Sequence, residues 1–254
     1  MNPRGNTLQD AQVAAEYVSY AVNYISAITG NGNVSVVTWS QGAISAQWAF
    51  KYFKSTRNYV SDHVSIAPDY HGTIEVPLVC PPGIPCAPSV LQQKYNANYI
   101  QTLRAHGGTN AYVPTTEIHN IFDEVVEPQF DPIASAHLDG DTTNVQVQNV
   151  CPAGTLAGGP NLGHENALYN PVTFAVAKDA LTNPGPANIA RSGASGMCDV
   201  FMAPGLSLVD VFATEALIPL AGFNIETYPS KIVAEPPIVR YAATDAPLGA
   251  PIAN

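Results

Sequence analysis

The hydrophobic positions of the chain follow two periods in turn, which predicts helices and strands that alternate. Over residues 8–28 apolar side chains recur mostly at steps of three and four, as in an amphipathic helix, and Gly30 and Gly32 then end it. A β-branched run at 34–39 predicts the first strand. Helix-forming residues with an apolar stripe resume at once over 41–54.

The rest of the chain continues this alternation with a weaker signal. Strands alternating with helices imply a mostly parallel sheet covered by helices on both faces. We therefore predict a single α/β domain over 1–254, with a loop-like tail over about 229–254. The further elements expected, in chain order, are a strand at 63–67, a helix from Ser89 through His106, strands at 111–118 and 144–150, and helices at about 170–182 and 207–222.

The junction between the first strand and its helix is the most informative point of the sequence. The strand stops at Ser40 and the helix follows directly, which is the layout of a nucleophile elbow, a sharp turn that lifts a serine hydroxyl above the sheet. Gly42 would let the turn close against the strand, and the Gln41 N–H would point to where an oxyanion forms. A serine that only caps a strand–helix turn needs the same local geometry. Thr38 stands where Gly-x-Ser-x-Gly motifs have their first glycine.

A serine nucleophile needs a base and a carboxylate, and in this type of fold the acid precedes the histidine in the chain. Of six histidines, only His137 and His164 follow the best acid. We favour His164, because its glycine-rich segment after the last strand could lean over the elbow; a solvated loop histidine is the alternative. Asp123 suits the triad acid. Asp69 would border the acyl pocket with a pKa raised by burial, and a surface carboxylate is the alternative for either.

Composition excludes several classes of function. Charged residues make up 12% of the chain and the net charge is −10, so no basic surface is available to bind nucleic acid. No run approaches 18 consecutive apolar residues, and the first residues hold no apolar signal core. The histidines lack the spacing of metal ligands, so neither a metal nor a cofactor is expected.

The four cysteines indicate an oxidising compartment. Cys80 and Cys86 bracket a short proline-rich loop that a disulfide could close, which leaves Cys151 and Cys198 as a second pair. An even number without Cys-x-x-Cys spacing favours disulfides over zinc, and hence a secreted, extracellular protein. Four buried free thiols in a cytosolic protein are the alternative.

Six short segments, taken together, form a specific signature. They resemble the Candida antarctica lipase B-like family of fungal serine lipases, which has the α/β-hydrolase fold. The likeness extends from about Leu8 to the region of Cys198 and fades over the last 50 residues. The segments are Thr38-Trp39-Ser40-Gln41-Gly42, Ala67-Pro68-Asp69-Tyr70, Ala87-Pro88-Ser89-Val90, Gln92-Gln93, Val113-Pro114-Thr115-Thr116 and Asp123-Glu124-Val125-Val126.

The resemblance implies roles for individual residues. Ser40, Asp123 and His164 would be nucleophile, acid and base, and the Gln41 N–H an oxyanion donor. The substrate-binding residues would be Thr38, Trp39, Asp69, Gln93 and Val125, with Val125 near the acid. Cys151–Cys198 matches a family disulfide, and the Cys80–Cys86 loop stands where the family has a mobile segment at the pocket mouth.

The front of the chain departs from the family pattern. Family members carry early strands before the first helix and a threonine that completes the oxyanion hole, whereas this sequence starts almost at that helix, truncated relative to the family. We expect a weakened oxyanion hole, and each lost donor costs about 10²–10³ in rate. The open apolar edge of strand 34–39 should also favour a homodimer or a strand-swapped assembly.

These observations favour a carboxylic ester hydrolase that acts on triacylglycerols or smaller esters and contacts a lipid interface. The low charge and the apolar positions of 206–223 suit a pocket wall, although plain core is the alternative for that segment. An inactive or nearly inactive relative that binds or assembles is the competing hypothesis, motivated by the missing oxyanion residues. An acyltransferase or peptidase with the same triad has no distinguishing feature in the sequence.

Overall fold

In the computed structural model, which describes residues 4–30, 32–160 and 163–254, four parallel strands form one sheet. The strands lie in chain order, so their carboxyl ends share one edge of the sheet, where Trp39 pairs with Ile66 and Ile66 with Ile118. The predicted parallel α/β sheet is confirmed. The strands are β1 (Val34–Trp39), β2 (Val60–Ile66), β3 (Asn110–His119) and β4 (Asp139–Gln146).

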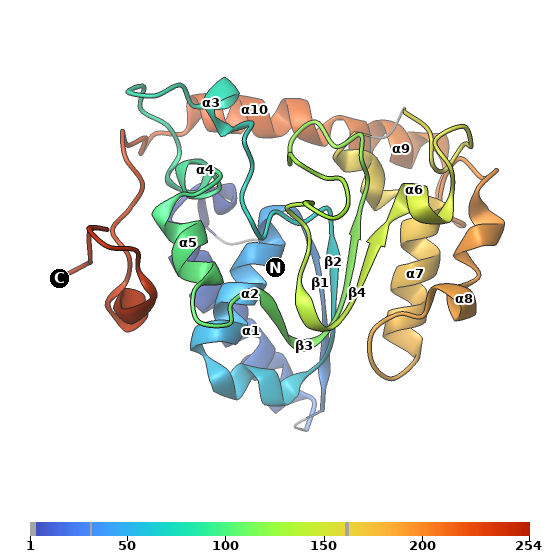
Figure 1. Ribbon diagram of the computed structural model, residues 1–254, viewed down its shortest axis with the longest axis horizontal. Coiled ribbons are helices and arrows are strands. Elements are labelled where there is room, and N and C mark those ends of the chain that lie inside the picture. The colour runs from blue at the N-terminus through green and yellow to red at the C-terminus, as the bar shows by residue number, and fades with distance from the viewer. Residues whose placement is uncertain (1–3, 31, 161–162) are drawn as a thin grey trace.

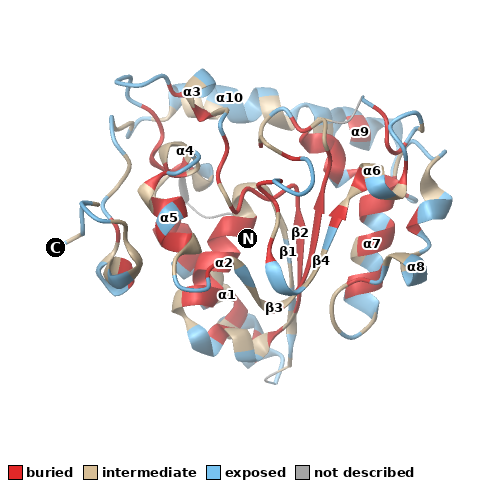
Figure 2. Cartoon of the chain, viewed as in Figure 1, coloured by how far each residue is buried: buried red, intermediate tan, exposed pale blue. Residues whose placement is uncertain are grey.

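Helices cover both faces of this sheet (Figure 1). On one face α1 (Ala11–Ile28), α2 (Gln41–Tyr52) and α5 (Asn98–Arg104) pack together, and the Trp48 ring stacks on Tyr99 at 4.5 Å. On the other face α7 (Pro171–Thr182) packs against β2 and β3. Buried residues concentrate on β2, on the carboxyl half of β3 and on the helix faces that meet them (Figure 2).

Short elements and two disulfides complete the frame. All four cysteines are paired, Cys80 with Cys86 and Cys151 with Cys198, as the sequence predicts. The short elements are η1 (Arg4–Thr7), η2 (Lys54–Tyr59), α3 (Val76–Val79), α4 (Pro88–Gln92), α6 (Val147–Val150), η3 (Glu165–Leu168), α8 (Ile189–Ser192), η4 (Ala194–Met197) and η5 (Arg240–Asp245).

The first helix is where it was expected, but its apolar stripe does not face the core. Tyr20 and Ile28 are about two-thirds exposed, while the buried face consists of small residues such as Ala11 and Ala15. Small side chains let α1 lie close to α2. The larger residues of the stripe are therefore left on the outside, beside β1.

Two of the expected elements have different boundaries. The helix expected over 89–106 is divided into α4 and α5, because the chain between them passes through Asn96 in a left-handed conformation with φ of 63°. The strand expected at 144–150 is wrong in its second half. β4 starts earlier, at Asp139, and residues 147–150 form the helical turn α6. Among the described residues β4 pairs with β3 alone, so it tolerates polar residues that hydrophobic alternation does not signal.

The helix expected at 207–222 is divided into α9 (Leu208–Glu215) and α10 (Leu217–Thr227). Pro219 lacks the N–H that would continue the helical hydrogen bonding through the junction. The plain-core alternative for this segment is wrong, because only Val211 is buried in α9 and α10 has no buried residue. Phe212 is 72% exposed.

The stretch formed by α9 and α10 is apolar enough and long enough to cross a membrane by length and composition alone. Its best window has a mean hydropathy of 1.5, although only 6% of that window is buried. Asp210, Glu215 and Glu226 interrupt its apolar character. In Figure 1 the two helices run along the top of the view, beyond the carboxyl ends of the strands.

The last residues are loop-like, as expected, but they are firmly attached. The Glu235 carboxylate accepts hydrogen bonds from the backbone N–H groups of Asn98 (2.6 Å) and Tyr99 (3.1 Å), at the start of α5. The Asp245 carboxylate lies 2.9 Å from the Lys51 ammonium group of α2. The last residues of the chain are therefore attached to both α2 and α5.

Candidate active site

Ser40 lies at the sharp turn between β1 and α2, with φ of 54° and ψ of −131°. A non-glycine residue with positive φ costs of order 1–3 kcal/mol, so the surrounding structure must hold it in place. The Ser40 N–H donates to the carbonyl of Ile66 at 2.9 Å, and the Ser40 carbonyl accepts from Ala43 at 2.9 Å. Gln41 is the first residue of α2, so its N–H has no acceptor within the helix.

Gly42 and Thr38 explain how this turn closes. A Cβ atom on Gly42 would lie 3.3 Å from the Thr38 Cβ, a tight contact that a larger residue would worsen. The Thr38 hydroxyl lies 2.9 Å from His63 Nε2 and is therefore engaged with β2. Burial lowers the pKa of His63 to about 3, so this histidine is neutral. Threonine thus gains a hydrogen bond at the position where related motifs have glycine.

His164 and Asp123 form a buried pair, as the sequence order suggests. His164 Nδ1 lies 2.7 Å from Asp123 Oδ2, and both side chains are at most 1% exposed. The other carboxylate oxygen of Asp123 accepts from the N–H groups of Val125 (3.0 Å) and Val126 (2.8 Å). Burial opposes a charge on His164, but the charge and hydrogen bond of Asp123 outweigh it and raise the His164 pKa above 6.5.

The His164 ring lies next to the elbow. The ring of Trp39, the residue before Ser40, is 5.0 Å from it between centroids, and Trp39 Nε1 donates to the His164 carbonyl at 3.3 Å. His164 Nε2 is buried and has no hydrogen-bond partner among the described residues. Asp123 and His164 are therefore joined and the His164 ring adjoins the elbow, but no hydrogen bond links Ser40 to His164.

Asp69 is the other carboxylate of this region. It is fully buried, and neither of its carboxylate oxygens has a hydrogen-bond partner among the described residues. Burial raises its pKa to about 7; a positive charge on His164 lowers it and the charge of Asp123 raises it. The sequence expectation of a raised pKa agrees with this environment.

Gln93 lies on the α2 side of the elbow. Its amide donates to the Gln41 side-chain oxygen at 3.1 Å and to the Ser89 carbonyl at 3.0 Å. Val125 follows the acid directly, and its carbonyl accepts from the Thr73 hydroxyl at 2.8 Å. Gln93 therefore contacts the residue after Ser40, and Val125 contacts the Asp123 carboxylate through its own N–H.

Sequence reasoning missed one residue that positions His164. The Glu124 carboxylate accepts a hydrogen bond from the His164 backbone N–H at 3.1 Å. A Cβ atom on residue 163 would lie only 3.0 Å from this carboxylate, so a residue larger than glycine would crowd Glu124. The one sign of this role in the sequence is that Glu124 directly follows Asp123. His137, the histidine not chosen as base, lies instead beside Asp131.

Comparison with known proteins identifies the family. No protein-family model matches the chain. It is 34% identical over 247 residues to lipase B from Pseudozyma antarctica, covering 95% of this chain and 69% of that relative. The crystal structure of Aspergillus fumigatus lipase B superposes with a TM-score of 0.90 at 43% identity, covering 95% of this chain. The match spans 58% of that solved chain. The chain therefore belongs to the lipase B family and has its α/β-hydrolase fold.

Proposed function

We propose that this protein is a carboxylic ester hydrolase with Ser40 as nucleophile, His164 as base and Asp123 as acid. The observation that carries the proposal is the buried His164–Asp123 pair, whose imidazole ring adjoins the residue before Ser40 and whose Nε2 has no hydrogen-bond partner among the described residues. Membership of a family whose relatives are named lipases supports it.

The reaction follows from these positions. His164 Nε2 accepts the Ser40 proton as Oγ attacks the ester carbonyl, while Asp123 holds Nδ1–H and stabilises the imidazolium. The protonated His164 then gives its proton to the leaving alcohol oxygen, and an acyl-serine ester remains. His164 then takes a proton from water, whose oxygen attacks the acyl carbon. The bond between that carbon and Ser40 Oγ breaks, His164 returns the proton to Oγ, and the carboxylic acid leaves.

We assign the Gln41 N–H as oxyanion donor, because it is free of helical bonding and directly follows the nucleophile. The proposal includes a weakened oxyanion hole. An ester hydrolysis rate about 10²–10³ below that of a lipase B with two donors would support it. Equal rates would contradict it.

The substrate pocket is proposed to include Asp69, Gln93 and Val125 around the elbow, with Thr38 and Trp39 at its base. With a pKa of about 7, Asp69 is protonated in roughly half of the molecules at neutral pH. A protonated carboxyl group can donate a hydrogen bond to an ester oxygen, which an ionised one cannot.

A labelling experiment separates the hydrolase from an inactive relative. Wild-type chain and the variants Ser40→Ala and Ser35→Ala are treated with a fluorophosphonate probe and assayed on p-nitrophenyl butyrate. Ser35 is a matched control, because it lies on β1, the strand that leads to Ser40, and its hydroxyl contacts the Ser61 hydroxyl at the surface. Labelling and activity should disappear in Ser40→Ala and persist in Ser35→Ala. An unlabelled wild-type Ser40 would favour a binding or assembly role.

We propose that the natural substrate is a lipid ester or triacylglycerol reached at a lipid surface. The exposed apolar helices α9 and α10 lie beyond the strand ends, on the side of the sheet where Ser40 follows β1. A helix pair of this composition can rest in a membrane interface with its apolar residues buried.

We propose that a second copy of the chain completes the free edge of β1. Among the described residues β1 pairs only with β2, and a groove of about 390 Å³ runs between β1 and α1. Its lining is largely apolar and includes Val18, Ile25 and Val37. Unpaired strand edges with apolar surroundings attract other strands. The paired cysteines support export to an oxidising environment, which we also propose.

A further inference from the structure

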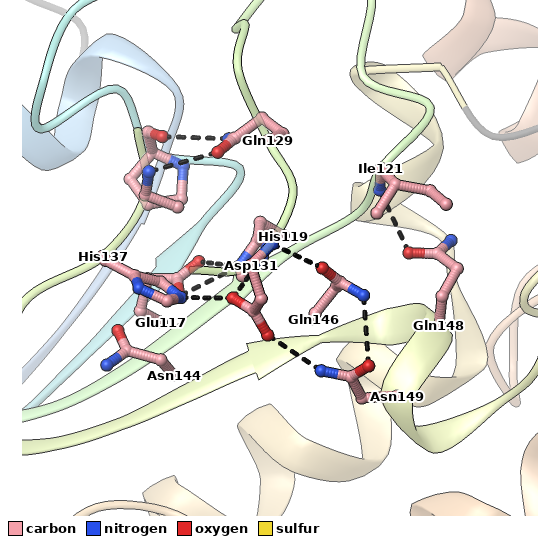
Figure 3. A network of polar contacts seen from close by, with 12 residues as sticks. Glu117, His119, Ile121, Gln129, Asp131, His137, Asn144, Gln146, Gln148 and Asn149 are labelled. Atoms are coloured by element: carbon pink, nitrogen blue, oxygen red, sulfur yellow. Dashed lines mark hydrogen bonds and ion pairs between the residues drawn. The ribbon is translucent and has the colours of Figure 1, made fainter. Parts of the chain in front are cut away.

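The carboxyl end of β3 leads into a cluster of histidines and carboxylates that the proposed hydrolysis does not use. Glu117 and His119 come from the end of β3, while Asp131 and His137 come from the segment between Asp123 and β4. One potential ligand atom from each of Glu117, His119 and His137 lies within 4.8 Å of the others. Figure 3 shows these side chains turned toward one another, with Asp131 beside the two imidazoles.

Three potential ligand atoms meet at the centre of this cluster. Asp131 Oδ1 lies 3.6 Å from His119 Nε2 and 2.5 Å from His137 Nε2. Both Nε2 atoms are buried and lack an aligned hydrogen-bond partner among the described residues. A lone pair and a carboxylate oxygen at this distance repel each other unless a proton or a cation lies between them.

His119 and Asp131 are each oriented by a contact at the atom that faces away from the centre of the cluster. Both carboxylate oxygens of Glu117 contact His119 Nδ1, at 3.0 and 3.1 Å, so a proton on Nδ1 leaves the Nε2 lone pair free. The Asn149 amide donates to Asp131 Oδ2 at 2.8 Å, which leaves Oδ1 facing the histidines. Carboxylate and amide partners of this kind orient the ligands in metal sites.

The electrostatics also favour a cation. The carboxylates of Glu117 and Asp131 lie against the two imidazoles, so negative charge surrounds the centre of the cluster. His119 and Glu117 are fully buried, whereas the side chains of His137 and Asp131 are 27% and 36% exposed. An ion could therefore enter from the side of His137 and Asp131.

We propose that His119 Nε2, His137 Nε2 and Asp131 Oδ1 bind a divalent transition ion, with Zn²⁺ the best match. Zn²⁺ takes histidine nitrogen together with carboxylate oxygen, whereas Ca²⁺ and Mg²⁺ prefer oxygen ligands alone. Glu117 acts as the positioning residue for His119. These ligands are distant in the chain, so sequence spacing gives no sign of the site. The ion would clamp the end of β3 to the segment between Asp123 and β4, independently of the proposed hydrolysis.

Zinc binding to the full chain tests this proposal. The protein is stripped with a chelator, dialysed and titrated with ZnCl₂ by calorimetry, and metal content is measured after removal of excess ion. We expect about one Zn²⁺ per chain and a rise in Tm with Zn²⁺ that equal concentrations of Ca²⁺ or Mg²⁺ do not produce. Because the ligands must lose their protons to bind the ion, the affinity for Zn²⁺ should fall as the pH is lowered.

Variants assign the ligands. His137→Ala and Asp131→Asn change the more exposed ligands and should each weaken Zn²⁺ binding more than Glu117→Gln, for which about 10–100-fold is expected. His106→Ala is the matched control, because His106 is exposed and pairs with Asp245; it should bind like wild type. Wild-type chain without stoichiometric Zn²⁺, or unchanged affinity in both His137→Ala and Asp131→Asn, would overturn the proposal. Fluorophosphonate labelling of Ser40 without zinc keeps this result separate from the proposed hydrolysis.

Discussion

At the scale of single residues, the protein maintains two unfavourable arrangements around the elbow. Ser40 has a backbone conformation that serine rarely adopts, and Asp69 is a carboxyl group buried without a hydrogen-bond partner among the described residues. The backbone conformation of Ser40 costs of order 1–3 kcal/mol, and such costs tend to be retained where they serve a reaction. Both lie near His164, whose pKa responds to the charges around it.

The pH dependence of hydrolysis should report on His164 and Asp123. The base must be neutral to accept a proton, and its pKa lies above 6.5, so kcat/KM should rise with pH through that pKa. Asp123→Asn removes the group that raises this pKa and fixes the tautomer. The variant should lose about 10⁴ in kcat, with its residual activity reaching a plateau at lower pH.

The control for this experiment is Asp139→Asn, an exposed carboxylate at the start of β4. Its pH–rate profile should match that of wild type. A plateau at the same pH in wild type and Asp123→Asn would show that the two residues are not coupled in the reaction.

Asp69 should make the protein less stable as the pH rises. Its pKa rises from 3.8 to about 7 on folding, so between these values the unfolded chain ionises while the folded chain holds its proton. The contribution of this group to the free energy of unfolding therefore falls from about pH 4 to about pH 7 and is constant above. Asp69→Asn removes this loss and should stabilise the protein at pH 8, by up to about 4 kcal/mol.

Urea unfolding of wild type and Asp69→Asn at pH 5 and pH 8 measures this effect. The gain in the variant should be clearly smaller at pH 5, where most of the loss has not yet developed. An equal difference at both pH values would mean that the substitution acts through packing alone.

At the scale of elements, the sequence predicted what depends on neighbours in the chain. β1, α2 and α7 were found close to their expected bounds, because β-branched runs and helical periodicity are local signals. Periodicity does not say what covers an apolar face. The stripes of α1 and of 206–223 are therefore apolar as expected but exposed.

The candidate site divides in the same way. The elbow at Ser40 and Gly42 is a local turn, and chain order was enough to suggest Asp123 with His164. The hydrogen bond from the His164 N–H to Glu124 depends on how two loops pack, and sequence spacing cannot predict that packing.

The exposed face of α9 and α10 should attach the protein to lipid surfaces. Phe212 and Phe223 are 72% and 64% exposed, and burying a phenylalanine side chain is worth about 1.5–3 kcal/mol. Phe212→Asp with Phe223→Asp should therefore reduce binding to phosphatidylcholine vesicles by at least about 100-fold in a sedimentation assay.

Leu248→Asp is the control for general surface polarity, because Leu248 is fully exposed in the C-terminal tail. It should bind vesicles like wild type, and labelling of Ser40 in solution should be unchanged in both proteins. Equal vesicle binding by the double variant would exclude these helices as the lipid contact.

At the scale of the whole molecule, the main open question is what covers the free edge of β1, which pairs only with β2 among the described residues. Val37 is 54% exposed near the middle of this strand. Size-exclusion chromatography with light scattering should give a dimer, and Val37→Lys should shift it to a monomer, because charges on an edge oppose strand pairing.

Val233→Lys introduces the same change at an equally exposed site in the tail and should leave the dimer intact. A wild-type mass equal to one chain at all concentrations would refute assembly through β1. A dimer unaffected by Val37→Lys would place the interface elsewhere.

The attachment of the last residues has a practical consequence for preparing the protein. A shortened version that omits everything after residue 229, chosen because those residues resemble dispensable coil, would remove Glu235 from the first turn of α5. It would also leave the Lys51 ammonium group enclosed without Asp245, its counter-ion. A purification handle should therefore not replace residues 230–254.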